Sequence, residues 1–240
     1  MTNHIAAASL NRTARVVGIL YLLIALFAPF SMIYVPSTLI VPGDAATTAS
    51  HVLVSEGLFR LGITSDSIVF LIEIVVTVLL YVLLKPVSKT LALVAAFSRL
   101  AMTVIQGINL LNYVFVLLLV SGAGYLAVFT RDQLHTLVLL FLNAHAAVAL
   151  IWGLCFGLHL FVLGYLVYTS GYIPRMLGIV LIIVSVCYLT QSFGNILLPK
   201  YEAIFASVAY LSIIEIAFPL WLVMKGVHVE QPEQRALEPA

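Results

Sequence analysis

Charge is scarce in this chain and its two signs nearly cancel. Only 9% of the 240 residues are charged, with 11 Lys and Arg against 10 Asp and Glu, so the formal net charge is +1. Soluble domains carry about 25% charged residues. The composition therefore excludes an ordinary soluble globular protein. The balanced charge also gives no basis for binding nucleic acid, which requires a surplus of Lys and Arg.

Cysteines and catalytic motifs are equally sparse. The two cysteines, Cys155 and Cys187, both lie in apolar runs, where thiols usually act as small core residues rather than as a disulfide or metal pair. The chain has no GxSxG, HExxH or phosphate-loop motif. His145 and His159 would lie about 21 Å apart on one helix, too far to share a metal. The sequence thus predicts no metal and no cofactor, and it leaves open whether the protein is an enzyme.

Long hydrophobic runs are what the chain does contain. Hydrophobic residues make up 63% of the sequence, and its mean hydropathy is +1.16. A helix needs about 20 apolar residues to cross a bilayer. We therefore predict an all-α, polytopic integral membrane protein, a six-helix transmembrane bundle that forms a single domain over residues 1–227. The predicted spans are residues 15–41, 58–84, 89–121, 134–169, 176–198 and 202–224.

Prolines and polar segments interrupt this pattern. Pro29 and Pro36 fall in the outer half of the first span, where each removes a helix hydrogen bond and predicts a kink or an early stop. Residues 42–56 are rich in Ala, Thr and Ser and are expected to form the one sizeable loop. Pro219 predicts a second irregular point, because it cannot donate a hydrogen bond to the carbonyl of the residue four positions earlier. The polar tail, residues 228–240, is expected to be disordered.

The distribution of positive charge predicts the orientation. Six spans place both termini on the same side of the membrane, and cytoplasmic loops are enriched in Lys and Arg. With the N-terminus inside, the inner ends of the spans carry six such residues and the outer ends three. The inner ones are Arg12, Arg15, Lys85, Lys89, Arg175 and Lys225, and the outer ones are Arg60, Arg131 and Lys200. We therefore predict that both termini, including the tail, are cytoplasmic.

The fourth predicted span has two faces that favour protein neighbours over lipid. Three glycines line one face and are typical of a close helix contact of the GxxxG kind. Two histidines share the other face with aromatic residues. The glycines are Gly153, Gly157 and Gly164, and the second face carries His145, Trp152, Phe156 and His159. This helix should therefore lie near the middle of the bundle.

Four ionisable residues on different spans are predicted to share one depth near the membrane centre. At 1.5 Å per residue, Arg99, His159 and Glu215 lie about 15 Å from the cytoplasmic end and Glu73 about 18 Å. An unpaired charge at that depth costs about 3 kcal/mol or more. These side chains should therefore converge, with Glu73 beside Arg99 and Glu215 beside Arg99 or His159.

A second polar level is predicted nearer the outside. It consists of Asp66, Gln106, Asn109, His145, Gln191 and Asn195. Asp66 lies seven residues from Glu73, and Gln106 lies seven residues from Arg99, so each pair shares a helix face. The two levels together outline a polar path from the outer face to mid-membrane. The same residues are equally compatible with a closed, purely structural hydrogen-bond network.

Four runs resemble one family of membrane proteins. They are FRLGITSDS (59–67), KPVSKTLALVAAFSRL (85–100), FGLHLFVLGYLVYTSGYIPRMLGIVLIIVSVCYL (156–189) and EIAFPLWLVMKGV (215–227). These runs resemble the bacterial family catalogued as domain of unknown function 4386, with SGYIPRMLG as the most specific part. The resemblance implies a multi-pass protein of the bacterial inner membrane. It implies no activity, substrate or cofactor.

Three hypotheses about function follow. In the first, a small solute, lipid or proton enters the bundle and is bound or transported through the mid-membrane cluster. In the second, the protein is structural or binds a partner, and its polar core is inert. In the third, an intramembrane enzyme uses His159 or Glu215 as a general base on a lipid-borne substrate. The lipid bilayer is the one partner that the sequence establishes, and no oligomeric state is predicted.

The predicted pairing of Glu73 with Arg99 can be tested by a double-mutant comparison. Arg99→Ala would leave a buried carboxylate without its partner, which typically costs about 3 to 5 kcal/mol. Glu73→Gln combined with Arg99→Gln removes both charges and should therefore be less destabilising than Arg99→Ala alone. The readout is the melting temperature in detergent of the wild type, the single variants and the double variant. A double variant less stable than either single variant would show that the two side chains do not meet.

Overall fold

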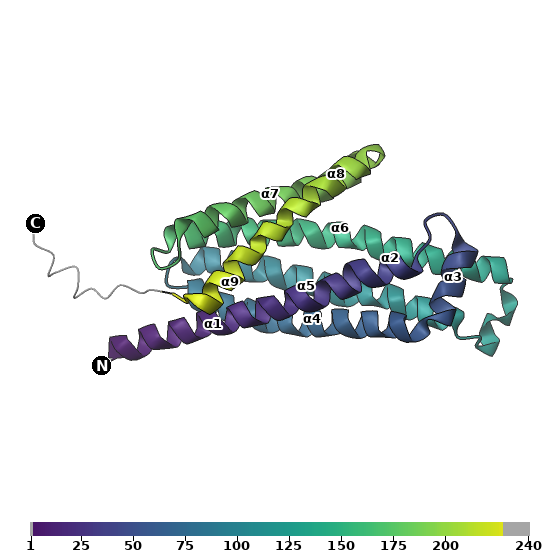
Figure 1. Ribbon diagram of the computed structural model, residues 1–240, viewed down its shortest axis with the longest axis horizontal. Helices are drawn as coiled ribbons and strands as arrows, with labels where there is room; N and C mark the ends of the chain where they lie inside the picture. Colours follow the sequence, from purple (N-terminus) through teal and green to yellow (C-terminus); the bar gives the residue numbers. More distant parts are fainter. Residues whose placement is uncertain (1, 228–240) are drawn as a thin grey trace, which may run out of the picture. The chain divides into compact units, whose positions relative to one another are not determined.

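The computed structural model describes residues 2–227, and within that range the chain is helical and contains no β-strand (Figure 1). Within residues 2–227, five helices are long and apolar enough to cross a membrane. They cover Ser9–Leu39, Glu56–Leu84, Lys89–Val120, Arg131–Thr169 and Arg175–Leu197. The prediction of an all-α, multi-span membrane protein is confirmed. The predicted tail, residues 228–240, lies outside the described residues.

The first span is one helix with an irregular segment between its two prolines. It consists of α1 (Thr2–Pro29), a π-helical turn η1 (Phe30–Tyr34) and α2 (Val35–Leu39). The N–H of Val35 bonds to the carbonyl of Phe30, five residues back, which is the π-helical pattern. The wider turn allows the helix to continue past a proline that cannot donate a hydrogen bond. The chain therefore remains helical past both Pro29 and Pro36.

Residues 42–56 are not the loop that the sequence led us to expect. They contain a helix, α3 (Ala45–Val54). Its N-cap is Asp44, whose carboxylate accepts hydrogen bonds from the backbone N–H and the hydroxyl of Thr47, at 2.9 and 2.7 Å. These bonds hold the pKa of Asp44 below its usual value. A capped run of alanines and threonines with one buried face is sufficient for a short helix.

Four long helices follow, each starting and ending close to the predicted span. They are α4 (Glu56–Leu84), α5 (Lys89–Val120), α6 (Arg131–Thr169) and α7 (Arg175–Leu197), with a 3-10 turn η2 (Gly124–Val128) before α6. Gly171, two residues beyond the end of α6, has a φ of +76°, a conformation that favours glycine and ends the helix.

The sixth predicted span, residues 202–224, is not one continuous α-helix. A short turn η3 (Pro199–Tyr201) leads into α8 (Glu202–Ala209), a 3-10 segment η4 (Tyr210–Ile216) and α9 (Ala217–Met224). The irregular segment ends at Ile216, within one turn of Pro219, whose missing N–H weakens α-helical bonding over the preceding turn. The number of six spans is therefore approximate.

The chain divides into two compact units, and the boundaries between them fall inside α1, α4, α5 and α6. Unit 1 comprises Met1–Leu22, Ile74–Leu100 and Gly153–Ala240, and unit 2 comprises Leu23–Glu73 and Ala101–Trp152. Unit 2 has a hydrophobic core to which α2, α3, α4, α5 and α6 all contribute. Its buried residues are Val35, Leu39, Ala49, Val52, Phe59, Tyr113, Val116, Val138 and Leu142.

A glycine contact joins α6 to α7 in unit 1. A methyl group on Gly164 would lie 2.7 Å from the carbonyl oxygen of Gly178, and one on Gly178 would lie 2.5 Å from the carbonyl oxygen of Gly164. On the same face of α6, Gly157 packs against Leu189 and Gly153 against Ser192. The two backbones approach so closely that no side chain fits between them. The predicted close helix contact is confirmed.

The C-terminal helices of unit 1 are anchored at both ends. Helices α7 and α8 run side by side and antiparallel (Figure 1), and the ring of Phe205 occupies the space that Gly194 leaves open. Helix α9 packs on α1, where Gly18 lies against the carbonyl of Pro219. The N–H of Val227 also donates to the side-chain oxygen of Asn11 at 3.2 Å. The irregular segment η4 thus connects two anchored helices.

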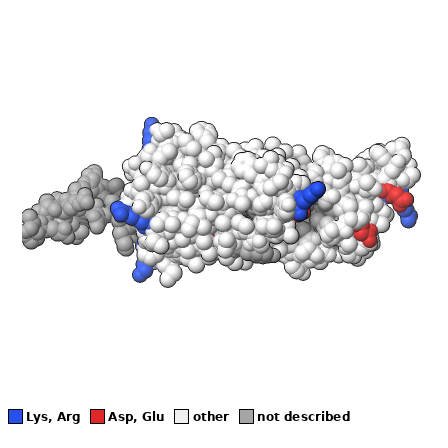
Figure 2. All heavy atoms as spheres, turned by 90° about the horizontal axis from the view of Figure 1, so that it is seen from above, with Lys and Arg blue, Asp and Glu red and all other residues white. Residues whose placement is uncertain are grey.

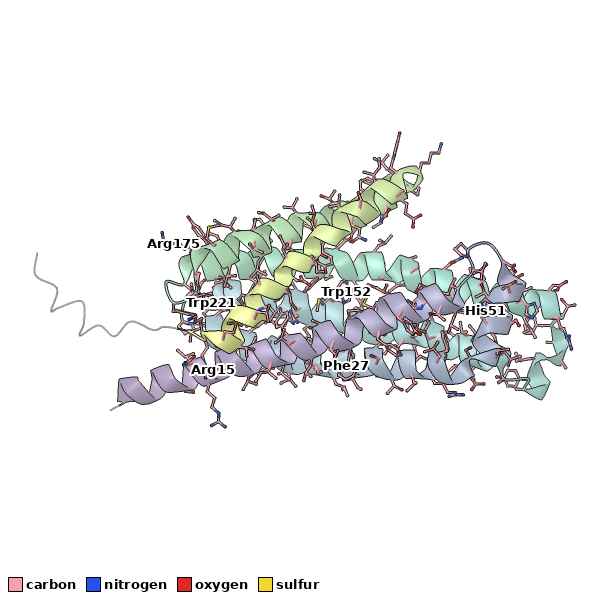
Figure 3. All side chains as sticks on the ribbon, in the orientation of Figure 1. Arg15, Phe27, His51, Trp152, Arg175 and Trp221 are labelled. Atoms are coloured by element: carbon pink, nitrogen blue, oxygen red, sulfur yellow. The ribbon has the colours of Figure 1, made fainter. Side chains whose placement is uncertain are left out.

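The surface is that of a protein in contact with lipid. Nearly all of the face in Figure 2 is uncharged. Figure 3 labels two of the cations predicted at cytoplasmic ends, Arg15 on α1 and Arg175 at the start of α7, and both are exposed. The guanidinium of Arg175 lies 5.8 Å from the ring centre of Tyr168. A cation beside an aromatic ring is typical of a membrane–water interface.

We predict that Gly164→Ala destabilises the protein. Overpacking of this kind costs about 1 to 3 kcal/mol, more than the gain of up to about 1 kcal/mol from replacing a helical glycine. Gly57→Ala in α4 is the matched control, because a methyl group there meets nothing within 4 Å. The free energy of unfolding in mixed micelles should fall for the first variant and stay or rise for the second. Equal values for the two variants would contradict the glycine contact.

Candidate functional site

The guanidinium of Arg99 lies at the centre of the candidate site in unit 1. The side chain is 0% exposed, although it is the longest cation available to the chain. Its Nη1 donates to the hydroxyl oxygen of Tyr21 on α1 and contacts Nε2 of His159 on α6 at 3.0 Å. Its Cζ lies 4.5 Å from the ring centre of Tyr21 and 6.0 Å from that of Phe156. Polar groups and aromatic faces together replace the water that the cation has lost.

The contacts of His159 define its tautomer. Its Nδ1 lies 2.8 Å from the backbone carbonyl oxygen of Ala95, one helical turn before Arg99 on α5. A carbonyl oxygen only accepts, so Nδ1 carries a proton. A guanidinium only donates, so Nε2 is the acceptor from Arg99. The ring, which is 1% exposed, is therefore neutral, and a second proton would point at the guanidinium.

Aromatic rings connect this pair to Glu215. The ring of Phe156 is nearly parallel to that of His159, at 6.0 Å and 15°, and meets the ring of Tyr188 edge to face at 4.9 Å. The hydroxyl of Tyr188 donates to Oε1 of Glu215 over a long 3.5 Å. Glu215 lies in the irregular segment η4. Its direct pairing with Arg99 or His159 stays a prediction.

A small cavity lies beside Arg99 and His159, within unit 1. Its volume is about 10 Å³, which is the lower limit for holding one water molecule. Ten residues from α4, α5 and α6 line it, and most of them are apolar. They are Thr77, Leu80, Tyr81, Leu84, Ala92, Ala95, Ala96, Arg99, His159 and Leu163. In this conformation the cavity excludes a solute of several atoms.

The fourth residue of the predicted cluster, Glu73, is the last residue of the first segment of unit 2. It is buried, at 4% exposure, on α4. Glu73, Arg99 and His159 are therefore all buried. The Glu73–Arg99 ion pair stays a prediction. Across residues 2–227, no group of three His, Cys, Asp or Glu side chains lies close enough together to hold a metal ion.

Four of the six residues predicted at the outer level form contacts within unit 2. The amide of Gln106 donates to Oδ1 of Asp66 at 2.6 Å. The amide of Asn109 donates to the backbone carbonyl of His145 at 3.0 Å. The ring of His145 stacks on that of Tyr113, with centres 3.8 Å apart and planes 13° apart. These contacts join α4 to α5 and α5 to α6.

The other two, Gln191 and Asn195, belong to unit 1 and are half-buried on α7. The side-chain oxygen of Asn195 is buried and has no hydrogen-bond partner among the described residues. The structure thus pairs four of the six residues within one unit. That all six form a single level stays a prediction.

Three tyrosines at these sites were missed in the sequence. Tyr21 holds Arg99, Tyr188 holds Glu215 and Tyr113 stacks on His145. Tyrosines are common at membrane interfaces, where they need no specific partner. Position was the available signal, because all three lie well inside their spans, where a hydroxyl requires a hydrogen-bond partner.

Comparison with known proteins places the chain in a family. The family described as Domain of unknown function (DUF4386) matches residues 16–226. An uncharacterized protein of Archaeoglobus fulgidus is 28% identical over 162 residues, which covers 66% of this chain and 80% of that protein. No solved structure matches the chain. The family match covers most of the sequence, including α4 to α9, so this multi-span membrane protein belongs to the DUF4386 family.

Proposed function

We propose that the protein binds a small solute or a proton within the membrane at the cluster of Arg99, His159 and Glu215, and transports it. The supporting observation is the complete burial of Arg99, an obligate cation, in the middle of an apolar bundle. Ionisable residues at membrane depth are costly and commonly mark ligand or ion pathways. A lipid is a less suitable ligand than a solute of a few atoms, because three helices pack closely around the cavity.

We interpret the small size of the cavity as the closed conformation of such a transporter. A volume of about 10 Å³ accommodates at most one water molecule, so a larger ligand requires the helices to separate. Transporters bind their ligand near the midplane and expose the site by moving helices, and broken helices are common at such sites. The segment η4 is an irregular break of this kind, and it carries Glu215.

One observation favours a structural function instead. Both ring nitrogens of His159 are occupied by groups of the protein itself, the carbonyl of Ala95 and the guanidinium of Arg99. A closed network of this kind fixes the register of α5 against α6 without any ligand. The transport and structural functions differ in one measurable property. A transporter exposes the cluster to water in some conformation, whereas a structural core does not.

We further propose that the protein resides in the bacterial inner membrane with both termini in the cytoplasm. The excess of Lys and Arg at the predicted inner ends supports this orientation. The cavity would then open towards the cytoplasm, because it lies between the last turns of α4 and the first turns of α5.

Thiol accessibility of the cavity wall tests the proposal. In a chain whose native Cys155 and Cys187 are replaced by Ala, Ala92→Cys places one thiol in the wall. A charged, membrane-impermeant thiol reagent reacts only where water reaches a thiolate. We expect Ala92→Cys to react, at a rate at least about tenfold above that of a lipid-facing thiol.

Two positions on the same helix serve as controls. Phe97→Cys replaces a side chain that is 66% exposed on the outside of the bundle and should stay unreactive in lipid. Lys89→Cys lies at the exposed start of α5 and should react only when the reagent is on the cytoplasmic side. Labelling of Ala92→Cys no faster than that of Phe97→Cys would favour the structural function.

A further inference from the structure

Asp66 is a buried acid of unit 2 that lies among uncharged groups. Its side chain is 5% exposed, and the residue lies in the middle part of α4. The structure gives its carboxyl one hydrogen bond, from the amide of Gln106 at 2.6 Å. Among residues 2–227, no Lys, Arg or His forms an ion pair with it, and Arg60 on the same helix pairs with Glu56.

Neither cation of unit 2 can neutralise an ionised Asp66 carboxylate. Unit 2 contains two of them, Arg60 and Arg131. Arg60 is bonded to Glu56. It lies six positions before Asp66, which places the two about 9 Å apart along the helix axis and about 120° apart around it. Arg131 is exposed at the start of α6.

The other groups around Asp66 are neutral. Tyr113 on α5 lies within electrostatic reach of the carboxyl, and its ring is covered by that of His145 on α6. Helix α1 packs on α4 here, since Ser65 donates to the carbonyl of Phe27 at 3.0 Å, and residues 23–29 contain no titratable side chain. Tyr34, the titratable residue of the adjoining π-helical turn, is exposed.

We infer that Asp66 is a proton-binding site, whose carboxyl keeps its proton to a higher pH than an exposed carboxyl does and releases it as the pH rises towards neutral. An ionised carboxylate in an apolar interior needs a cation or several donors, and a single amide is not enough. The neutral acid fits the observed contact, because its carbonyl oxygen accepts from Gln106 without a net charge. The ligand of this site is therefore the proton itself.

This inference goes beyond the proposed function and does not depend on it, because it concerns unit 2 and not the Arg99 cluster. If both hold, unit 2 supplies a reversible proton site to a protein that moves a ligand elsewhere. Transporters often couple such a carboxyl to their transport cycle. Its loss should then change the pH dependence of transport and leave thiol labelling of Ala92→Cys unaffected.

Infrared spectroscopy of the full-length protein in lipid tests the site directly. A protonated carboxylic acid has a carbonyl stretch that a carboxylate lacks. At mildly acidic pH the wild type should show this band and Asp66→Asn should lose the intensity of one carboxyl group. The wild-type band should weaken as the pH rises through neutral. Glu73→Gln and Glu215→Gln are matched controls that identify the intensity from the other buried acids. An identical band in the wild type and Asp66→Asn at every pH would overturn the inference.

Gln106→Ala provides a second test that keeps the acid in place. The amide of Gln106 also stabilises the ionised form, so its removal should move the loss of the band to higher pH. This variant decides the question if Asp66→Asn does not fold. Absence of the Asp66 carbonyl band at mildly acidic pH, in both the wild type and Gln106→Ala, would also overturn the inference.

Discussion

The constraint on which unit 1 depends is the positive charge of Arg99 in a low-dielectric interior. A guanidinium cannot lose its proton, so the fold must surround it with acceptors and aromatic faces. The hydroxyl of Tyr21, the ring nitrogen of His159 and two aromatic rings meet this need from α1 and α6. The carbonyl of Ala95 then fixes His159 in return. One charge on α5 thereby determines the positions of side chains on two other helices.

The remainder of unit 1 supports this arrangement through close backbone packing. Gly164 and Gly178 bring α6 and α7 into direct contact, and Gly18 does the same for α1 and α9. In a membrane, where lipid is as apolar as the side chains, such contacts contribute van der Waals packing that larger residues would prevent. The rings of Phe156 and Tyr188 fill the space between α6 and α7 and lead to Glu215. Packing and polar contacts therefore stabilise the same set of helices.

The class of fold could be predicted from the sequence because apolar runs of more than twenty residues have few alternatives. Burial of Arg99, Glu73 and His159 was also predictable, since charges inside such runs must face protein. The helix α3 was missed because its short, polar sequence resembles a loop until the capping contact between Asp44 and Thr47 is seen.

The partners within the site were harder to predict. Depth along a helix follows from counting residues, but the angular position of one helix against another does not. The sequence therefore brought Arg99 and His159 to one level, but it did not pair them with each other and it overlooked Tyr21. Gln191 and Asn195 belong to a different unit from Asp66, so the predicted single outer level stays a prediction. Such choices depend on packing between helices far apart in the sequence.

The tautomer of His159 tests the account most directly, because it depends on both of the contacts that hold the ring. Nitrogen-15 magnetic resonance of histidine-labelled protein in lipid can report it, with the signal assigned by its disappearance in His159→Gln among the six histidines of the chain. The account predicts a neutral ring at neutral pH, protonated at Nδ1 and unprotonated at Nε2. A ring protonated at Nε2, alone or together with Nδ1, would mean that Arg99 cannot donate to it and would contradict the arrangement described for the site.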